Sequence, residues 1–274
     1  MLAQRAIVAL LLLPIGIAAI LIGGWPFVVL AAIVLTLAAV EYLQLFSSNR
    51  NLPQRGFVVI ALLILIWLRW SFAFDWDWLL LPIILLAAML FHLIQYERGI
   101  EHAGSEFAIS VSAIFYVGYL GAYLFEIRHL ETGAWLLILS FAATWMSDMG
   151  AYFLGSRFGK HKMAPRLSPQ KSWEGYLGGI LFSVLLTPLF AKALQHFGMP
   201  ENTLTSGNNL LFLALALSIL TPLGDFGISM IKRQVHAKHT GTILPGHGGM
   251  LDRMDSILWA LPISFALITL YFNH

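Results

Sequence analysis

A polar interval between two apolar runs decides the fold of this chain; it reads KRQVHAKHTGTILPGHGGMLDRMD and covers residues 232–255. The runs on either side, 210–231 and 257–272, approach the roughly 20 residues that a helix needs to cross a bilayer core. The interval is rich in cations, glycines and carboxylates, which are the residue types that bind phosphate and metal ions. We therefore predict a phosphate-handling site at a membrane surface.

The composition of the whole chain is that of a membrane protein. Of its 274 residues, 59% are hydrophobic and 11% are charged, and the mean hydropathy is +0.79; charged residues make up about 25% of a soluble domain. The net charge of +2 is too small to indicate a nucleic-acid partner, and the absence of cysteine excludes disulfides and thiolate chemistry. We predict a single membrane domain over 1–274, in which 1–127 holds N-terminal helices with few motifs and 133–274 holds the catalytic helices and cytoplasmic loops.

Nine segments have the length and apolar character of membrane-spanning helices, which predicts an all-α polytopic integral membrane protein. With the N-terminus in the cytoplasm, thirteen of the sixteen Lys and Arg residues fall in cytoplasmic loops. The positive-inside rule thus favours a cytoplasmic N-terminus and a C-terminus on the opposite side. Both long polar loops, 155–174 and 232–255, then face the cytoplasm. The predicted segments are 5–22, 26–46, 57–72, 77–95, 107–127, 133–154, 175–197, 209–231 and 256–273.

The loop at 155–174 opens on GSRFGK and leads into SPQKSWEG, which begins at residue 168. Pro169 predicts a turn, and Ser172 predicts an N-cap for the seventh helix. The Gly-x4-Gly-Lys-Ser/Thr spacing of a Walker A loop is missing. A substrate-binding loop and an ordinary positively charged cytoplasmic loop explain this pattern equally well.

The glycine-rich turn GHGG at 246–249 is a candidate anion site. Glycine backbone adopts positive φ readily, which allows several N–H groups to converge on one ligand. A tight re-entrant turn is the alternative. His247 could bind a metal or donate to a phosphate, and it could equally cap backbone groups. The cations that could bind phosphate oxygens are Lys232, Arg233, Lys238 and Arg253.

Carboxylates lie in or beside the apolar segments, where each costs about 2.5–3.5 kcal/mol at the membrane centre. Asp252 and Asp255 are three residues apart, so on a helix they share a face. A hard divalent cation is held by one or two carboxylates together with substrate phosphates, which Asp225 with Asp252 could offer. Structural pairing of Asp225 with Lys232, or of Asp252 with Arg253, is the alternative. The carboxylates concerned are Asp148, Asp225, Asp252 and Asp255.

The stretch TPLGDFG at 221–227 predicts a break in the eighth helix, because Pro222 and its glycine neighbours can free backbone carbonyls near Asp225. A broken helix with an intramembrane acid is also found in transporters, so a cation-coupled transporter is an alternative function. The first half of the chain has no matching broken segment, whereas the inverted repeats of many transporters would require one.

Together these motifs resemble those of the phosphatidate cytidylyltransferases, also called CDP-diacylglycerol synthases. The resemblance covers the C-terminal half of the chain, and the first five predicted helices resemble the family in hydropathy alone. The family has Asp directly after the lysine at 238, where this chain has His239, so a respecialised or inactive paralogue is an alternative. The matching stretches are DMGAY at 148–152, SPQKSWEG at 168–175, SMIKR at 229–233, Lys238, PGHGG at 245–249 and DRMD at 252–255.

The resemblance implies an enzyme that converts CTP and phosphatidate to CDP-diacylglycerol and pyrophosphate, in a multi-span helical fold that is usually a homodimer. It implies that Asp225 and Asp252 hold Mg²⁺, with K⁺ beside it as an open alternative, and it makes Asp255 a further candidate ligand. The expected location is a bacterial inner (plasma) membrane, with the active site facing the cytoplasm. The remaining candidates are Lys232 and Arg253 for catalysis, and Ser168, Lys171, Arg233, Lys238, His247, Gly248 and Gly249 for substrate binding.

The residues suit this chemistry. The second pKa of a phosphomonoester is about 6, so phosphatidate is already a nucleophile near neutral pH and needs no strong base. The site has to suppress repulsion between two polyanions and align the attack on the α-phosphorus. Another CTP-dependent lipid transferase or a lipid kinase is a related alternative; a kinase would transfer the γ-phosphate and release CDP.

Overall fold

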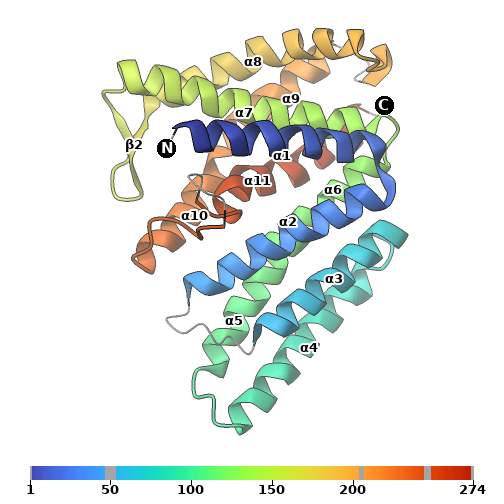
Figure 1. The fold of residues 1–274 in the computed structure, drawn as a ribbon, viewed down its shortest axis with the longest axis vertical. Helices are drawn as coiled ribbons and strands as arrows, with labels where there is room; N and C mark the ends of the chain where they lie inside the picture. The colour runs from blue at the N-terminus through green and yellow to red at the C-terminus, as the bar shows by residue number, and fades with distance from the viewer. Residues whose placement is uncertain (1, 47–53, 204–206, 244–247, 273–274) are drawn as a thin grey trace. The chain divides into compact units, whose positions relative to one another are not determined.

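The computed structural model describes residues 2–46, 54–203, 207–243 and 248–272, and these are helical nearly throughout (Figure 1). Within these ranges, eight helices are long and apolar enough to cross a membrane. The first predicted segment lies in helix α1 (Leu2–Ile22), so all nine predicted segments are largely helical. The all-α prediction is confirmed, and the exact number and direction of the crossings stay predictions.

The chain forms two compact packing units. The first consists of Met1–Glu126 with Val235–Met254, and the second consists of Ile127–Gln234 with Asp255–His274. The segment 235–254, which contains most of the polar interval, therefore packs with the N-terminal helices rather than with its immediate neighbours in sequence. A single membrane domain is one that folds as a whole. The division into two packing units does not test this, so the single domain stays a prediction.

Helices of the first unit bury one face and expose another that is equally apolar. Fully buried Leu35, Leu62 and Leu65 lie in the core of this unit, whereas Ile83 and Leu86 are exposed. Exposed leucine and isoleucine are expected where the surrounding solvent is lipid. The elements are α1, α2 (Gly24–Leu45), α3 (Gln54–Phe72), α4 (Asp77–Glu97), α5 (Ala103–Ala113), the π-helical η1 (Ile114–Tyr119) and the start of α6 (Leu120–His129).

A buried ion cluster lies among α3, α4 and α6. Arg69, in the last turn of α3, is fully buried and contacts Asp77 at 2.6 Å and Glu126 at 3.0 Å. Its guanidinium also lies 3.7 Å from the ring centre of Phe74. The topology prediction counts Arg69 among the residues on the side opposite the cytoplasm. Its position in the sequence gives no sign of its buried partners.

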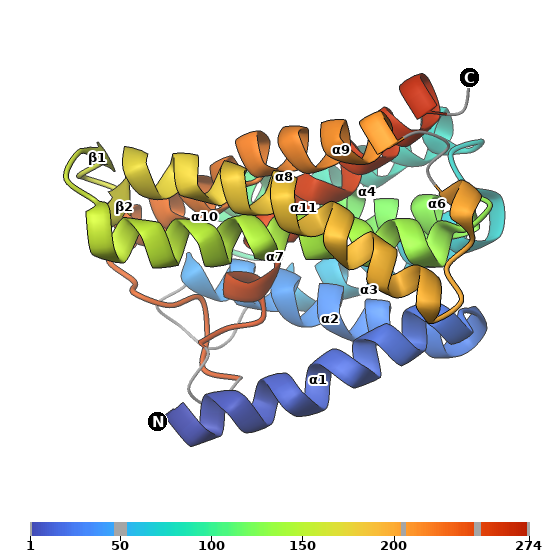
Figure 2. The ribbon, with the colours of Figure 1, turned by 90° about the horizontal axis from the view of Figure 1, so that it is seen from above.

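In the second unit, α7 (Gly133–Phe158) and α8 (Trp173–His196) lie side by side along much of their length (Figures 1 and 2). Small residues allow this close approach. A Cβ added to Gly179 would lie 2.7 Å from the carbonyl oxygen of Ser147, and one added to Gly175 would lie 2.8 Å from that of Ala151. The later elements are η2 (Glu201–Thr203), α9 (Gly207–Leu220), α10 (Pro222–Gln234), α11 (Leu251–Leu267) and η3 (Ile268–Phe272).

A two-stranded antiparallel hairpin connects α7 to α8 and consists of β1 (Lys162–Ala164) and β2 (Ser168–Ser172). The sequence did not predict this sheet, and the turn predicted at Pro169 is wrong because Pro169 lies within β2. The predicted N-cap is confirmed, since the Gly175 N–H donates to the Ser172 hydroxyl at 3.2 Å where α8 begins.

The predicted break in the eighth segment is also confirmed. Helix α9 ends at Leu220 and α10 begins at Pro222, with Thr221 as a turn between them. Proline lacks an N–H and disfavours helical geometry in the residue before it, which accounts for the interruption. As a result, Asp225 lies in the first turn of α10.

Candidate active site

Asp225 forms a close ion pair in the second unit. Its Oδ2 lies 2.5 Å from the Lys171 ammonium, and its Oδ1 accepts a hydrogen bond from the Ser229 hydroxyl at 3.2 Å. The same ammonium lies 4.5 Å from the ring centre of Phe226. Lys232 also attracts Asp225 electrostatically. The pair thus links strand β2 to the start of α10.

Two further acids of the second unit interact electrostatically with Asp225 or with each other. Asp148 on α7 and Asp225 both interact electrostatically with Asp255 on α11, whose side chain is largely buried. The Asp255 Oδ1 accepts a hydrogen bond from the Ser256 N–H at 2.7 Å. Like charges in a poorly solvated region repel one another, so these carboxylates favour an intervening proton or cation.

The second unit brings Asp225 and Asp255 together through the packing of α10 on α11. A Cβ on Gly224 would lie 2.7 Å from Cδ1 of Trp259 and 3.0 Å from the carbonyl carbon of Asp255. A glycine at this position therefore lets the first turn of α10 contact the α11 backbone directly.

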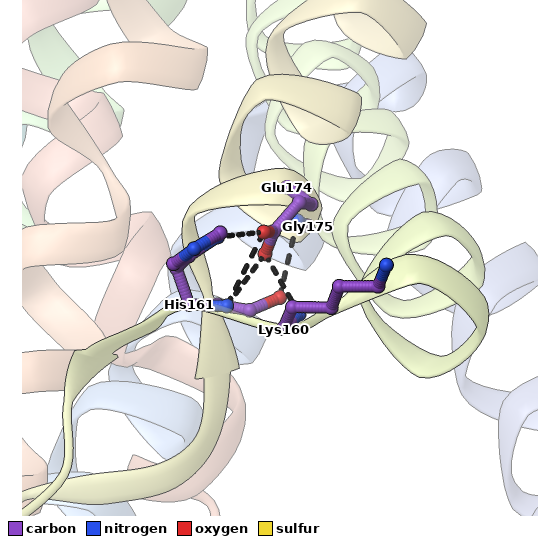
Figure 3. A network of polar contacts seen from close by, with 5 residues as sticks. Lys160, His161, Glu174 and Gly175 are labelled. Atoms are coloured by element: carbon purple, nitrogen blue, oxygen red, sulfur yellow. Dashed lines mark hydrogen bonds and ion pairs between the residues drawn. The ribbon is translucent and has the colours of Figure 1, made fainter.

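A carboxylate at the start of α8 fixes the loop that carries Lys171 (Figure 3). Glu174 accepts hydrogen bonds from the backbone N–H groups of Lys160 at 3.1 Å and His161 at 3.2 Å. It also contacts the His161 ring at 2.5 Å. Sequence reasoning missed this role; an acid in the first turn after a serine N-cap was the available signal.

Two other candidate residues of the second unit belong to the β1–β2 hairpin or bind it. Arg233, at the end of α10, donates from Nε to the carbonyl oxygen of Leu167 at 3.2 Å, so this nitrogen binds the hairpin. Ser168 begins strand β2 and is partly buried. The predicted residues that lie in this unit are Ser168, Lys171, Asp225, Lys232, Arg233 and Asp255.

In the first unit, Asp252 organises the glycine-rich segment. Its Oδ2 accepts hydrogen bonds from the N–H groups of Thr240 at 3.0 Å and Gly249 at 3.2 Å. The same oxygen lies 3.7 Å from Nδ1 of His239, so the residue that departs from the family pattern is a neighbour of this acid. Asp252 lies in the first turn of α11 and Asp255 follows in the same helix, as predicted.

The predicted positive φ is confirmed at Gly248, which has φ +85°. A Cβ there would lie 2.9 Å from the Asp252 carboxylate, so both the backbone and the space require glycine. Lys238 and Arg253 are exposed, and the other predicted residues of this unit are Gly248, Gly249 and Asp252. Gly246 and His247 lie outside the described residues.

Within the described ranges, no group of three or more His, Asp or Glu side chains is arranged to hold a metal ion. Mg²⁺ in phosphate-transferring sites takes one or two carboxylates and completes its shell with water and substrate phosphate, so a smaller donor set still suits it. The predicted joint binding of an ion by Asp225 and Asp252 pairs residues of different units and stays a prediction.

The chain is similar to known enzymes along nearly its whole length. The model of the family described as "Cytidylyltransferase family" matches residues 3–271, so the similarity extends well beyond the C-terminal motifs. A phosphatidate cytidylyltransferase of Bacillus subtilis (strain 168) is 31% identical over 272 residues, which cover 98% of each chain. Enzymes with the same name from Staphylococcus epidermidis and Thermotoga maritima are 34% and 33% identical, over 94% and 86% of this chain and 94% and 85% of theirs.

Proposed function

The chain belongs to the cytidylyltransferase family, and on that premise we propose how its residues act in the reaction. It is a CTP:phosphatidate cytidylyltransferase, which makes CDP-diacylglycerol and pyrophosphate for phospholipid biosynthesis. The observation that carries our assignment of the site is the Lys171–Asp225 pair beside Asp255 and Lys232 in the second unit. This family membership counts against the kinase and transporter alternatives.

The reaction needs charge neutralisation and alignment more than proton transfer. A phosphatidate oxygen attacks the α-phosphorus of CTP, a new P–O bond forms, and pyrophosphate leaves. Both substrates are polyanions, so ammonium groups must offset their repulsion. Lys171 has three N–H donors, and its contact with Asp225 uses one side of the ammonium, which leaves donors to bind phosphate oxygens. Lys232, in the last turn of α10, adds a second positive charge.

Asp225 has two roles in this proposal. It holds Lys171 in a defined position, and its remaining coordination capacity, with that of Asp255, suits a hard cation. We propose Mg²⁺ as this ion; when bound, it neutralises phosphate charge and favours departure of pyrophosphate. K⁺ beside it is part of the same proposal and rests on the resemblance to the family.

The protein is an integral membrane protein. We propose that it lies in a bacterial inner (plasma) membrane as a homodimer, with loops 155–174 and 232–255 in the cytoplasm. The excess of Lys and Arg in these loops supports this orientation. It would give the site access to cytoplasmic CTP, and phosphatidate would enter laterally with its headgroup at the cytoplasmic face.

A labelling experiment tests the function. Purified protein in phosphatidate-containing vesicles is given CTP labelled either at the α- or at the γ-phosphorus, with Mg²⁺. We expect lipid to acquire only the α-label and to form only when phosphatidate is present. Transfer of the γ-label to lipid would identify a kinase instead, and the absence of any labelled lipid would refute the proposed reaction.

A further inference from the structure

Glu41 lies near the end of α2, in the half of the chain where the sequence showed few motifs, yet its partners lie in the polar interval. Its side chain is fully buried. Its Oε2 accepts hydrogen bonds from the Thr240 hydroxyl at 3.0 Å and from the Leu251 N–H at 2.9 Å. These two donors stand before and after the glycine-rich turn. One carboxylate oxygen therefore joins both ends of the loop.

The loop backbone also packs directly on this carboxylate. A Cβ on Gly241 would lie 2.6 Å from Cδ of Glu41, and a Cβ on Gly249 would overlap its Oε2 and the Thr240 hydroxyl. Since real Cβ atoms do not approach other atoms so closely, the loop can take this path only with glycine at both positions. The glycines thus allow the backbone to reach Glu41, in addition to any role toward a ligand.

The residues that bind Glu41 also bind Asp252. Thr240 donates its hydroxyl to Glu41 and its backbone N–H to Asp252, at 3.0 Å in each case. Gly249 contacts the Glu41 carboxylate and donates its N–H to Asp252 at 3.2 Å. Leu251, the second donor to Glu41, immediately precedes Asp252. The loop is therefore held between two carboxylates, and a shift at Glu41 would displace the donors that orient Asp252.

We propose that Glu41 is a positioning residue for cytidylyl transfer, which fixes Thr240, Gly249 and Leu251 so that Gly248, Gly249 and Asp252 keep their mutual geometry. This inference rests on the proposed function and on the predicted roles of Gly248, Gly249 and Asp252 in it. Glu41 acts on the reaction through these hydrogen bonds and touches neither substrate. Small displacements of positioned groups can cost about 100-fold in rate, which sets the size of the expected effect.

The buried carboxylate of Glu126 provides a matched control. It belongs to the same unit and is similarly buried, but it binds Arg69 rather than the loop. Phe27 near the start of α2 packs against Phe125, the neighbour of Glu126. Glu41 lies 14 residues further along α2, about 21 Å at 1.5 Å per residue. A loss of activity caused merely by removing the charge of a buried carboxylate would appear in both Glu41→Gln and Glu126→Gln.

The experiment measures kcat and KM for CTP per folded molecule, together with the rate of tryptic cleavage after the exposed Lys238. We expect Glu41→Ala to remain folded, to lose about 100-fold in kcat/KM, and to be cleaved faster. Glu41→Gln keeps one acceptor oxygen, so it should restore activity to within about 10-fold of wild type, and Glu126→Gln should resemble wild type. Wild-type kinetics and cleavage in Glu41→Ala would overturn the proposal, as would an equal loss in Glu41→Gln.

A second variant covers the case in which Glu41→Ala does not fold. Thr240→Val removes the hydroxyl that binds Glu41 but keeps the backbone N–H that binds Asp252. We expect a drop in kcat/KM of about 10-fold and faster cleavage, and unchanged values of both would overturn the proposal. If wild type makes no CDP-lipid, the proposed function fails, while the cleavage rates still report on the loop.

Discussion

At the scale of single residues, Asp225 and Asp255 have different surroundings and should respond differently to loss of charge. Asp225→Asn removes the partner of Lys171, so we expect kcat to fall by at least about 100-fold while the protein stays folded. Asp255→Asn should be milder, because the Oδ1 of Asp255 binds the N–H of its own helix and the change relieves repulsion by Asp225. Single-turnover formation of CDP-lipid measures both.

Glu201→Gln is the control for these two variants, since Glu201 is an exposed acid of the same unit in the short helix η2. It should retain wild-type kcat. Wild-type turnover in Asp225→Asn would remove both the metal role and the lysine-positioning role from this residue.

His239 provides a prediction about the cation requirement. It lies 3.7 Å from the Asp252 carboxylate, so His239→Asp would introduce a second acid beside it. Asp252 is a predicted Mg²⁺ ligand, and additional carboxylate charge beside a ligand strengthens the binding of a hard cation. We expect wild type to be active and His239→Asp to need less Mg²⁺ for half-maximal rate. The Mg²⁺ titration of the two proteins decides this, and an unchanged midpoint would show that residue 239 does not influence the ion.

At this scale the sequence indicates the residue types of the candidate site but not all of the side chains that they contact. Asp225, Lys171 and Gly248 are all candidates from the sequence, and pairing of Asp225 with Lys232, the alternative to a metal role, agrees with the attraction between their charges. The sequence does not indicate the ion pair of Asp225 with Lys171, which comes from strand β2, 54 positions earlier. Glu41 gave no signal, since a single glutamate in an apolar helix reveals nothing about a loop 200 residues later.

At the scale of helices and strands, the contact between α10 and α11 depends on Gly224. In Gly224→Ala the new Cβ would meet Trp259 and the Asp255 backbone, so we expect a loss of about 1–3 kcal/mol in stability and lower activity. Gly104→Ala is the matched control, because its Cβ would meet nothing within 4 Å in helix α5. Thermal unfolding in detergent compares the two; equal melting temperatures would show that α10 and α11 can separate at no cost.

The sequence predicts the helices better than the strands. Long apolar runs and the Pro222 break were predicted because length and proline chemistry act locally. The β1–β2 hairpin was missed because its strands are short and polar, without the alternation that marks a half-buried strand. Its stability depends instead on contacts such as those of Glu174, which no local pattern encodes.

At the scale of the whole molecule, the absence of cysteine makes the predicted orientation directly testable. Ser156→Cys introduces a thiol at an exposed position in the predicted cytoplasmic loop, and Glu201→Cys introduces one on the predicted opposite side. In intact cells, an impermeant maleimide should label Glu201→Cys and leave Ser156→Cys unlabelled until the membrane is opened. The reverse pattern would invert the topology.

The grouping of 235–254 with the N-terminal helices affects how this gene could be divided. The polypeptide leaves α10, joins the packing unit of Glu41, and returns to the second unit within α11. A fragment that begins near residue 127 would carry every sequence motif of the family and still lack the carboxylate on which its glycine-rich loop rests. Gene halves split at that point would need to be expressed together. The N-terminal half, which has few motifs, would be required for the glycine-rich loop of the other half to take its path.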